Sequence, residues 1–416
     1  MRQPTRRDAL KGIAGVSAAA IGASRARALP SGEHERTIVV GAGVFGVWTA
    51  IHLQRLGRPV LLLDAWGPAH TRSSSGGESR MTRAAYGADE IYTRMALNSL
   101  EEWKALSRRA DLPIFHRTGV LFFFPDRSAY LAESLRVHRA LGLTSRHMVR
   151  REMRMRFPAI DFDGVEAGIY EPDFGALMAR RGVQTLMSEF IAKGGLYRRA
   201  AIAPPRIAGG RIEQVVTKDG ERISGSTFVF AAGAWLPKLF PELLNSRIFP
   251  TRQEIFFFAT PAGDPRYEVG RLPGWADFNG GDLYYGFPDL EGRGFKIARD
   301  THGPPIDPDT AERLATPSML ADVRKFMSRR FPALAGAPLN EARVCQYENS
   351  ANGDFLIDRH PAAANAILVG GGSGHGFKHG PAVGQYAAAL LTESPGTVQP
   401  RFSLASKSEK QAREVH

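Results

Sequence analysis

Short apolar runs that end in glycine-rich turns are the main hydrophobic pattern of this chain. The β-branched run from Thr37 to Val40 predicts a buried strand, and residues 47–56 after it predict a helix. A second apolar strand is expected over residues 59–63. Strands that alternate with helices predict an α/β fold with a parallel sheet. The same pattern returns later in two strands and a helix, at residues 226–232, 366–369 and 381–391.

The turn after the first strand carries three glycines at the spacing of a dinucleotide-binding loop. Gly41 permits a tight turn, Gly43 lets backbone N–H groups approach a pyrophosphate, and Gly46 lets the helix pack on the strand. Asp64 ends the second strand 23 residues after Gly41, where a carboxylate accepts hydrogen bonds from a ribose diol. These residues predict a nucleotide site at the start of the helix.

Two later segments favour FAD over NAD as the nucleotide. A turn at residues 218–221 separates two strand-like runs, and strand 226–232 leads into a small-residue turn. This arrangement is similar to the second FAD-contacting segment of glutathione-reductase-type flavoproteins. The strand at 366–369 ends in a turn containing Gly374 and Gly376, which would bring backbone close to a flat ring such as isoalloxazine. Because these pieces are distant in sequence, we expect a discontinuous nucleotide domain.

The first 28 residues resemble a targeting segment. Arg6 and Arg7 precede an apolar run over residues 12–24, which is shorter than the roughly 20 residues of a membrane-spanning helix. Ala26-Arg27-Ala28 then suits signal peptidase. We therefore expect a twin-arginine signal peptide over residues 1–28, export of the folded chain by that machinery, and a periplasmic or secreted protein. The alternative is a basic, alanine-rich start with no targeting function.

Charge and cysteine content exclude several classes of protein. The net charge is +12, but residues 1–28 carry five of these charges and the remaining arginines are scattered. A mildly basic surface that favours anionic substrates is expected, without nucleic-acid binding. The sequence has no zinc-ligand spacing and no further apolar stretch for stable membrane insertion. The single cysteine, Cys345, cannot form an intrachain disulfide.

Four further motifs carry a family resemblance. They are Gly77-Glu78-Ser79-Arg80-Met81-Thr82-Arg83 within residues 68–87, Tyr284-Tyr285-Gly286-Phe287-Pro288 with Gly294-Phe295-Lys296, Arg343-Val344-Cys345-Gln346-Tyr347 with residues 354–358, and Gly374-His375-Gly376-Phe377-Lys378. Spread over residues 37–391, they resemble the D-amino-acid-oxidase-like flavoproteins, most closely the branch of the monomeric sarcosine and N-methyltryptophan oxidases.

The resemblance implies a two-domain α/β fold. A glutathione-reductase-type, FAD-binding Rossmann domain is expected over residues 36–115, 176–250 and 345–392. An antiparallel-sheet substrate domain is expected over residues 116–175 and 251–344. The polar tail at 393–416 is expected to be loosely held, with Phe402 and Leu404 its only candidates for docking. Relatives of this branch are often monomers, so a monomer is expected.

The resemblance also implies three residues around the flavin. Cys345 matches a cysteine that forms a thioether to the 8-methyl group of FAD; a lone cysteine is otherwise most often buried and inert. Lys296 matches a lysine over the flavin that helps oxygen react, because a fixed cation stabilises superoxide. Arg80 matches an arginine beside the flavin that supports the anionic reduced ring. The ordinary alternatives are a surface lysine and a salt-bridged arginine.

A second group of residues matches the substrate site. Arg83 and Lys378 resemble a pair that holds a substrate carboxylate, for which a planar fork and a point charge are well suited. The alternative for Arg83 is a salt bridge. Tyr285 lines the pocket or simply packs in the core.

Two positions depart from the sarcosine oxidases. Asp300 stands where they carry an active-site histidine, unless His302 shifts into that place, and Gly76 stands where they carry another histidine. An anion near the substrate amine and a glycine that opens space by the flavin both indicate a substrate other than sarcosine.

These residues predict an FAD-dependent oxidase of the C–N bond of an amino acid, in particular a secondary (N-methyl or cyclic) one. Molecular oxygen would reoxidise the flavin and hydrogen peroxide would be released. Three alternatives stay open: a dehydrogenase that passes electrons to a carrier other than oxygen, a 2-hydroxy-acid oxidoreductase, and a flavin-binding protein without catalysis.

Overall fold

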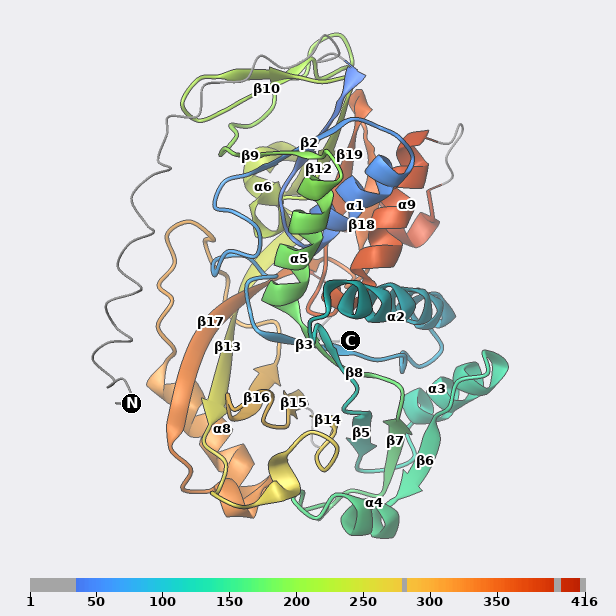
Figure 1. Cartoon of the computed structure of the whole chain (residues 1–416), viewed down its shortest axis with the longest axis vertical. Helices are drawn as coiled ribbons and strands as arrows, with labels where there is room; N and C mark the ends of the chain where they lie inside the picture. Colours follow the sequence, from blue (N-terminus) through green and yellow to red (C-terminus); the bar gives the residue numbers. More distant parts are fainter. Residues whose placement is uncertain (1–34, 279–282, 393–397, 412–416) are drawn as a thin grey trace, which may run out of the picture.

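The computed structural model describes residues 35–278, 283–392 and 398–411, which form two sheet-based parts stacked along the long axis of the molecule (Figure 1). The expected signal peptide, residues 1–28, lies outside the described residues. Among the described helices, none is long and apolar enough to cross a membrane.

One part is built on a six-stranded sheet with the order β18-β19-β12-β1-β2-β9. All neighbours in it run parallel except β18 and β19. The predicted α/β Rossmann fold is confirmed. In the order of the sheet, the strands are Leu356–His360, Ala363–Gly370, Thr227–Phe230, Thr37–Val40, Val60–Asp64 and Leu196–Arg199.

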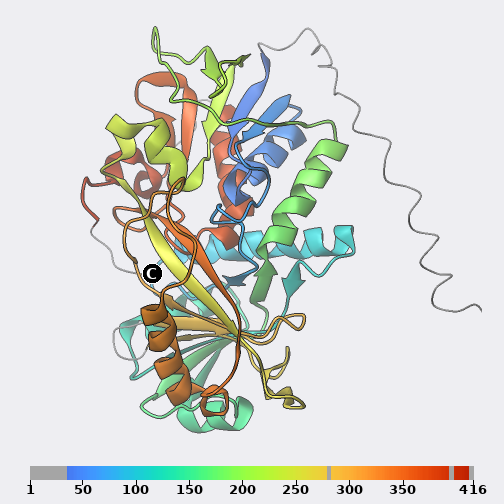
Figure 2. The same ribbon diagram turned by 90° about the vertical axis from the view of Figure 1, so that its left-hand side faces the viewer.

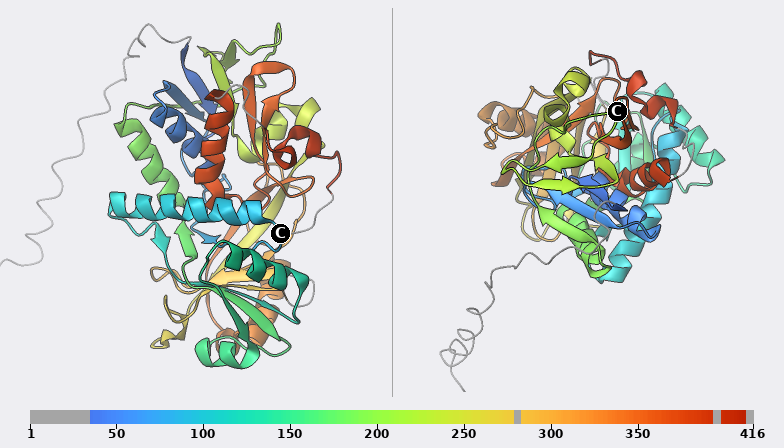
Figure 3. Two further views of the ribbon diagram at one scale, coloured as in Figure 1. Left: turned by 90° about the vertical axis from the view of Figure 1, so that its right-hand side faces the viewer. Right: turned by 90° about the horizontal axis from the view of Figure 1, so that it is seen from above.

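Three helices cover one face of this sheet (Figure 3). They are α1 (Val44–Arg55), α5 (Ala179–Ala192) and α9 (Gly380–Thr392). The apolar side chains of α1 are almost all buried, because α1 packs against the sheet, α5 and α9 together. The predicted hairpin also forms, from β10 (Gln214–Val216) and β11 (Arg222–Ser224), with its turn closed by the Thr217 amide donating to the Glu221 carbonyl at 2.8 Å.

The other part is an eight-stranded sheet with the order β17-β13-β16-β15-β14-β5-β7-β6. Its neighbours are antiparallel except β14 and β5, so the expected antiparallel sheet contains one parallel pair. Helix α8 (Pro317–Arg330) packs on this sheet beside β16. In the order of the sheet, the strands are Leu339–Ser350, Ile248–Phe258, Phe295–Asp300, Leu283–Phe287, Gly274–Asp277, Val120–Phe124, Ala167–Glu171 and Arg146–Val149.

A small layer lies between the two sheets. It holds the long helix α2 (Glu90–Ala110) and a three-stranded sheet in the order β3-β8-β4 (Figure 3). These strands are Ser79–Thr82, Gly175–Met178 and Phe115–His116. Helix α3 (Ala129–Ala140) packs against β7 and α2, and helix α4 (Arg150–Arg156) packs against β6 and β7 at the far end (Figure 1). Strand β3 carries Arg80 to the boundary between the two parts.

Two long strands run from one part into the other. Strands β13 and β17 pair antiparallel from Ile248 opposite Ser350 to Phe258 opposite Leu339 (Figure 2). The expected domain boundaries at residues 250 and 344 therefore fall inside continuous strands, which corrects them. Cys345 therefore lies inside this ladder, opposite Gln253, rather than in a linker.

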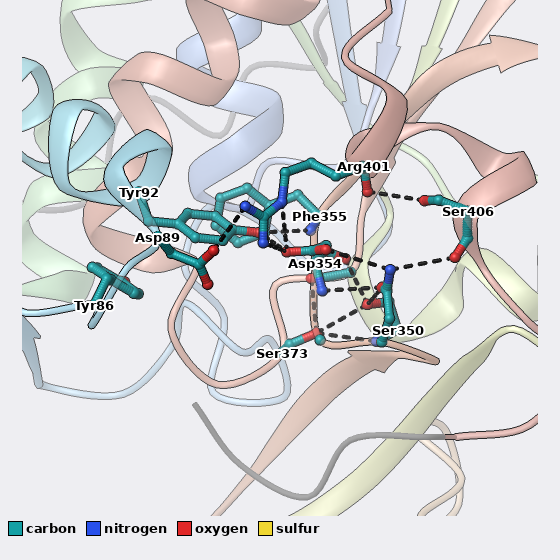
Figure 4. A network of polar contacts seen from close by, with 12 residues as sticks. Tyr86, Asp89, Tyr92, Ser350, Asp354, Phe355, Ser373, Arg401 and Ser406 are labelled. Atoms are coloured by element: carbon teal, nitrogen blue, oxygen red, sulfur yellow. Dashed lines mark hydrogen bonds and ion pairs between the residues drawn. The ribbon is translucent and has the colours of Figure 1, made fainter. Parts of the chain in front are cut away.

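The C-terminal tail is docked where the structure describes it, so the expectation of a loose tail is wrong for residues 398–411. The Arg401 guanidinium donates to Asp354 at 2.7 Å and to Asp89 at 3.0 Å (Figure 4). Phe402 is 2% exposed and packs in the core, and Leu404 packs at the edge of the core. Both residues dock as expected. The sequence did not indicate that Arg401 would hydrogen-bond to two carboxylates.

We expect Phe402→Ala to lower the free energy of unfolding by about 3 kcal/mol, because it removes a fully buried aromatic ring and leaves a cavity. Guanidinium unfolding followed by tryptophan fluorescence measures this. Met155→Ala is the control, since that side chain is 67% exposed on α4 and should change the value little. Equal stability of both variants would show that the tail is not docked.

Candidate functional site

A cavity of about 340 Å³ lies at the carboxyl ends of β1, β12 and β19. Parallel sheets of this kind bind ligands at that edge. The cavity continues along β17 as far as Cys345, so its wall includes parts of both sheets. Residues of its wall include Gly41, Gly43, Asp64, Arg80, Ala232, Gly233, Cys345, Tyr347, Glu348, Gly372, Gly374 and Gly376.

Close packing explains two of the three glycines of the predicted loop, Gly41 and Gly46. A Cβ at Gly41 would lie 2.3 Å from the Ala231 carbonyl oxygen, and Gly41 has a φ of +109°. A Cβ at Gly46 would lie 1.9 Å from the Gly41 carbonyl oxygen. Gly43 is the N-cap of α1 and has nothing closer to its Cβ position than the Ser75 Oγ at 3.5 Å. The start of α1 is therefore open toward the cavity, as a phosphate cradle requires.

Asp64 lies at the end of β2 and shapes this loop. Its Oδ2 accepts from the Ala42 amide at 2.7 Å, and its Oδ1 accepts from the amides of Trp66 and Gly67 at 2.8 and 2.7 Å. The side chain also lines the cavity. The carboxylate fixes the glycine loop, and its predicted contact with a ribose stays a prediction.

Cys345 and Arg80 lie together at the other end of the cavity. The thiol is almost buried, and the Arg80 Nη2 lies 3.5 Å from its Sγ. Arg80 is held there because its guanidinium donates to the carbonyls of Ser74 and Ser79 at 2.6 and 2.8 Å. The thiol therefore lies beside a fixed guanidinium group.

Lys296 lies next to this pair but outside the walls of the two cavities described here. Its ammonium donates to the Ser79 carbonyl at 2.8 Å and lies 5.7 Å from the ring centre of Tyr285. Burial and the nearby Arg80 lower the pKa of Lys296 well below its usual value. The alternative of a surface lysine is wrong, because Lys296 is 2% exposed.

A smaller cavity of about 70 Å³ adjoins the first. The two share Arg80, Tyr347, Gly374 and Phe377 as wall residues. The remaining wall residues of the smaller cavity are Met81, Arg83, Phe122, Ala276, Phe278, Leu283, Tyr285, Asp300, Ser373, His375 and Lys378. The structure thus brings Arg83, Lys378 and Tyr285 together from three distant segments.

Arg83 and Lys378 both contact the ring of Tyr86. The Arg83 Cζ lies 4.0 Å and the Lys378 Nζ 5.2 Å from its centre. Both side chains are buried, and their polar partners are the Ala85 and His375 carbonyls. Burial and the charge of Arg83 lower the pKa of Lys378 well below its usual value. The hydrogen bonds that the described residues give these two side chains go to neutral carbonyls, so an anion can bind between them, although Glu171 and Asp300 also act on both groups.

Asp300 faces this pair across the small cavity. Burial raises the pKa of its carboxyl to about 6, although a hydrogen bond from Tyr347 and the charges of Arg83 and Lys378 oppose the rise. Tyr347 is also hydrogen-bonded to Tyr285, so the three side chains form one chain. Tyr285 therefore lines the pocket as well as packing beneath it.

The structure corrects two predictions about the positions that differ from the sarcosine oxidases. His302 does not replace Asp300: it contacts Gln411 of the tail and is in neither cavity wall. Gly76 does not open space, because a Cβ there would lie 2.0 Å from the His70 carbonyl oxygen. Its own carbonyl accepts from Arg180 at 2.9 Å. Close backbone packing explains this glycine.

Tyr347, Glu348 and His375 were not predicted as site residues. Tyr347 was within reach of sequence reasoning, since it follows Cys345 by two positions on a strand and so shares its face. Glu348 and His375 gave no such signal. His375 is placed by the Tyr86 phenol at 3.1 Å and the Gly353 carbonyl at 3.2 Å, contacts that only the folded chain provides.

The large cavity fits a dinucleotide that carries a ring at one end. It provides the glycine cradle at the start of α1, and it reaches the Cys345 and Arg80 pair at the far end. Glu348 lies in its wall, and the buried carboxyl oxygen Oε1 of this residue has no hydrogen-bond partner within the described residues. The residues present therefore fit FAD.

Comparison with known proteins agrees with this fit. The sequence profile of the family described as FAD dependent oxidoreductase (DAO) matches residues 36–390. The chain is 32% identical to a monomeric sarcosine oxidase from Bacillus sp. (strain B-0618) over 362 residues, 86% of this chain and 92% of the relative. It is 31% identical to an N-methyl-L-tryptophan oxidase from Salmonella arizonae over 361 residues, 86% of this chain and 94% of the relative.

Solved structures share the fold. The L-proline dehydrogenase from P. horikoshii superimposes with a TM-score of 0.78 at 20% identity, over 89% of this chain and 97% of that one. A fructosyl amine:oxygen oxidoreductase (Amadoriase I) from Aspergillus fumigatus gives 0.74 at 21% identity, over 89% and 90%. With the profile match over most of its length and these relatives, the chain belongs to the DAO family of FAD-dependent oxidoreductases.

Proposed function

We propose that this enzyme is an oxidase of the C–N bond of a secondary amino acid, N-methyl or cyclic, which releases an imine and hydrogen peroxide. The observation that carries the proposal is the small cavity, where two cationic side chains and one carboxyl group face each other beside the cofactor cavity. Relatives named as sarcosine and N-methyltryptophan oxidases support the same class of substrate.

The substrate carboxylate binds Arg83 and Lys378. Among the described residues, Arg83 and Lys378 donate hydrogen bonds to carbonyls and not to a carboxylate. The carboxylate of the substrate supplies this missing partner. Its binding also restores the charged form of Lys378, whose pKa burial has lowered. The clamp thus fixes one end of the substrate.

The substrate nitrogen faces Asp300. An amino acid carries both charges, so its carboxylate complements the clamp and its ammonium complements Asp300. A 2-hydroxy acid brings only the negative charge and leaves Asp300 without a counter-ion. This charge pattern favours an amino acid over the hydroxy acid that remained as an alternative from the sequence.

Asp300 also prepares the amine for reaction. With a pKa of about 6, its carboxylate accepts the ammonium proton on an Oδ atom, while Tyr347 holds the group in place. The apolar side chains Phe122 and Phe278 keep water from the neutral amine. FAD, when bound, accepts the two electrons of the C–H bond and returns them to oxygen.

Oxygen as the electron acceptor is supported by the buried cation Lys296. Its side chain lies near Arg80 and Cys345, close to where the ring of FAD would bind. Burial and Arg80 lower the pKa of Lys296, and the negative charge of superoxide would favour the protonated amine, which stabilises superoxide as it forms. A dehydrogenase with a different acceptor would reduce the flavin with the same substrates but consume no oxygen. A protein without catalysis would do neither.

We further propose that Cys345 holds FAD covalently, since its thiol lines the cofactor cavity with Arg80 3.5 Å away. A covalent cofactor suits export of a folded, loaded enzyme by the twin-arginine machinery to the periplasm or beyond the cell. We propose that the enzyme works as a monomer.

Asp300→Asn should lower kcat/KM for an N-methyl amino acid by about a hundredfold, because the acceptor of the amine proton is lost. In the parent enzyme kcat/KM should rise with pH through about 6, as Asp300 loses its proton, and this rise should be absent in the variant. Asp322→Asn, a partly exposed carboxylate outside both cavities, is the matched control. The proposal fails if Asp300→Asn keeps both the rate and the rise near pH 6.

Acid precipitation tests the covalent bond. Yellow colour should stay with the precipitated parent protein and move to the supernatant in Cys345→Ser, because a hydroxyl does not form the thioether. The visible spectra of pellet and supernatant measure this. Colour released from the parent would contradict covalent attachment and leave the proposed reaction standing.

A further inference from the structure

We infer that Glu348 is a cofactor-contacting residue: its carboxyl group binds an oxygen in the central part of FAD, between the flavin ring and the pyrophosphate. This role goes beyond the proposed reaction. It concerns how the chain holds its cofactor, and it is independent of the substrate.

Glu348 lies on β17, three residues after Cys345, in the wall of the large cavity. Its side chain passes between the segments that follow β12 and β19. Its Oε2 lies 3.9 Å from the Cβ position of Gly233, and its Oε1 lies 2.2 Å from that of Gly370. The carboxyl group is therefore fixed at the carboxyl ends of two neighbouring strands.

The strand order defines which part of the cofactor it meets. Strands β19, β12 and β1 are consecutive in the sheet, and the phosphate cradle follows β1. Cys345 and Arg80, at the expected ring end, line the same cavity, and Cys345 precedes Glu348 by three residues on β17. A cofactor that reaches from the cradle to Cys345 must pass Glu348 with its ribityl and phosphate oxygens.

One carboxyl oxygen of Glu348 is buried without a hydrogen-bond partner among the described residues. Glu348 is 7% exposed, and this oxygen is its Oε1. The backbone amides of Gly371 and Gly372 interact with the same carboxyl group. An unpartnered oxygen in so buried a position costs about 1–3 kcal/mol unless a ligand satisfies it.

The carboxyl group meets the cofactor in its acid form. Burial raises the pKa of Glu348 to about 8, and the amides of Gly371 and Gly372 only reduce that rise. No charged side chain among the described residues that face it, on β17, β19 or the turn at Gly233–Trp235, shifts this pKa. Phosphates nearby also favour the neutral acid, whose O–H can donate to a cofactor oxygen.

The dissociation constant for FAD tests this contact. We would use holoprotein with Cys345→Ser, so that FAD is free to leave, and measure the flavin fluorescence released on dilution from pH 6.5 to 9.5. With Glu348 present, the dissociation constant should rise by up to about tenfold per pH unit above pH 8, because the ionised carboxylate loses its donor and repels phosphate.

Two substitutions separate the contact from folding. Glu348→Gln keeps an N–H donor, so FAD should bind within about threefold of the parent at pH 7 and the rise above pH 8 should vanish. Glu348→Ala should weaken FAD about tenfold at pH 7. Glu254→Gln is the control, since Glu254 is equally buried on the paired strand β13 but bonds to Arg252 and Thr316 outside the cavity.

The inference is overturned if Glu348→Gln keeps the same rise above pH 8, or if Glu348→Ala binds FAD as tightly as the parent. It is also overturned if Glu254→Gln weakens FAD as much as Glu348→Ala, because the loss would then reflect stability. Circular dichroism of each holoprotein confirms that the comparison is between folded chains.

Discussion

The site depends on one antiparallel ladder. Strands β13 and β17 stay paired from Ile248 opposite Ser350 to Phe258 opposite Leu339, and they connect the nucleotide sheet to the eight-stranded sheet. A paired strand of this length is stiff, because its residues are fixed by neighbours across the ladder, apart from one register shift near Phe258. The ladder therefore sets the distance between the cradle at the start of α1 and the residues that face the substrate.

Strand β17 contributes side chains to both cavities of the site. Cys345 and Tyr347 are two positions apart and share one face, where Cys345 meets Arg80 and Tyr347 holds Asp300. Glu348 follows them at the end of the parallel sheet. A shift of the ladder by one residue would turn the thiol and the phenol away together.

The small cavity, where we propose that the substrate binds, is lined by buried charged groups. Arg83, Lys378 and Asp300 are removed from bulk water, which strengthens their mutual interactions and shifts the pKa of Asp300 to about 6. A zwitterion balances this arrangement, whereas an apolar or singly charged molecule leaves part of it unpaired. The same burial explains why Lys378 needs an anion beside it to stay charged.

The first strand, the glycine loop and the helix after it were predictable from local sequence patterns. The strand at Thr37–Val40 forms with the bounds that were predicted, and the glycine spacing gave the cradle, because both depend on neighbours in sequence. The predicted helix begins three residues earlier, at Val44, since Gly43 caps it. The meeting of Arg83 with Lys378 came from the family resemblance rather than from any periodicity.

Other features depend on contacts between distant segments and were missed. Gly76 was read as open space, but the His70 carbonyl fills it. The C-terminal tail was predicted to be loosely held, because its sequence does not show that Arg401 hydrogen-bonds to Asp354 and Asp89. Glu348 could not be told from other strand residues in the sequence, because the segments that enclose it, after β12 and β19, are distant along the chain.

Anaerobic mixing of the FAD-loaded enzyme with matched substrates tests the central claim most directly. The account predicts that N-methyl and cyclic amino acids bleach the visible flavin absorbance, that the corresponding 2-hydroxy acids do not, and that admitting oxygen restores the colour. Bleaching by the hydroxy acids alone, or by none of these compounds, would contradict it.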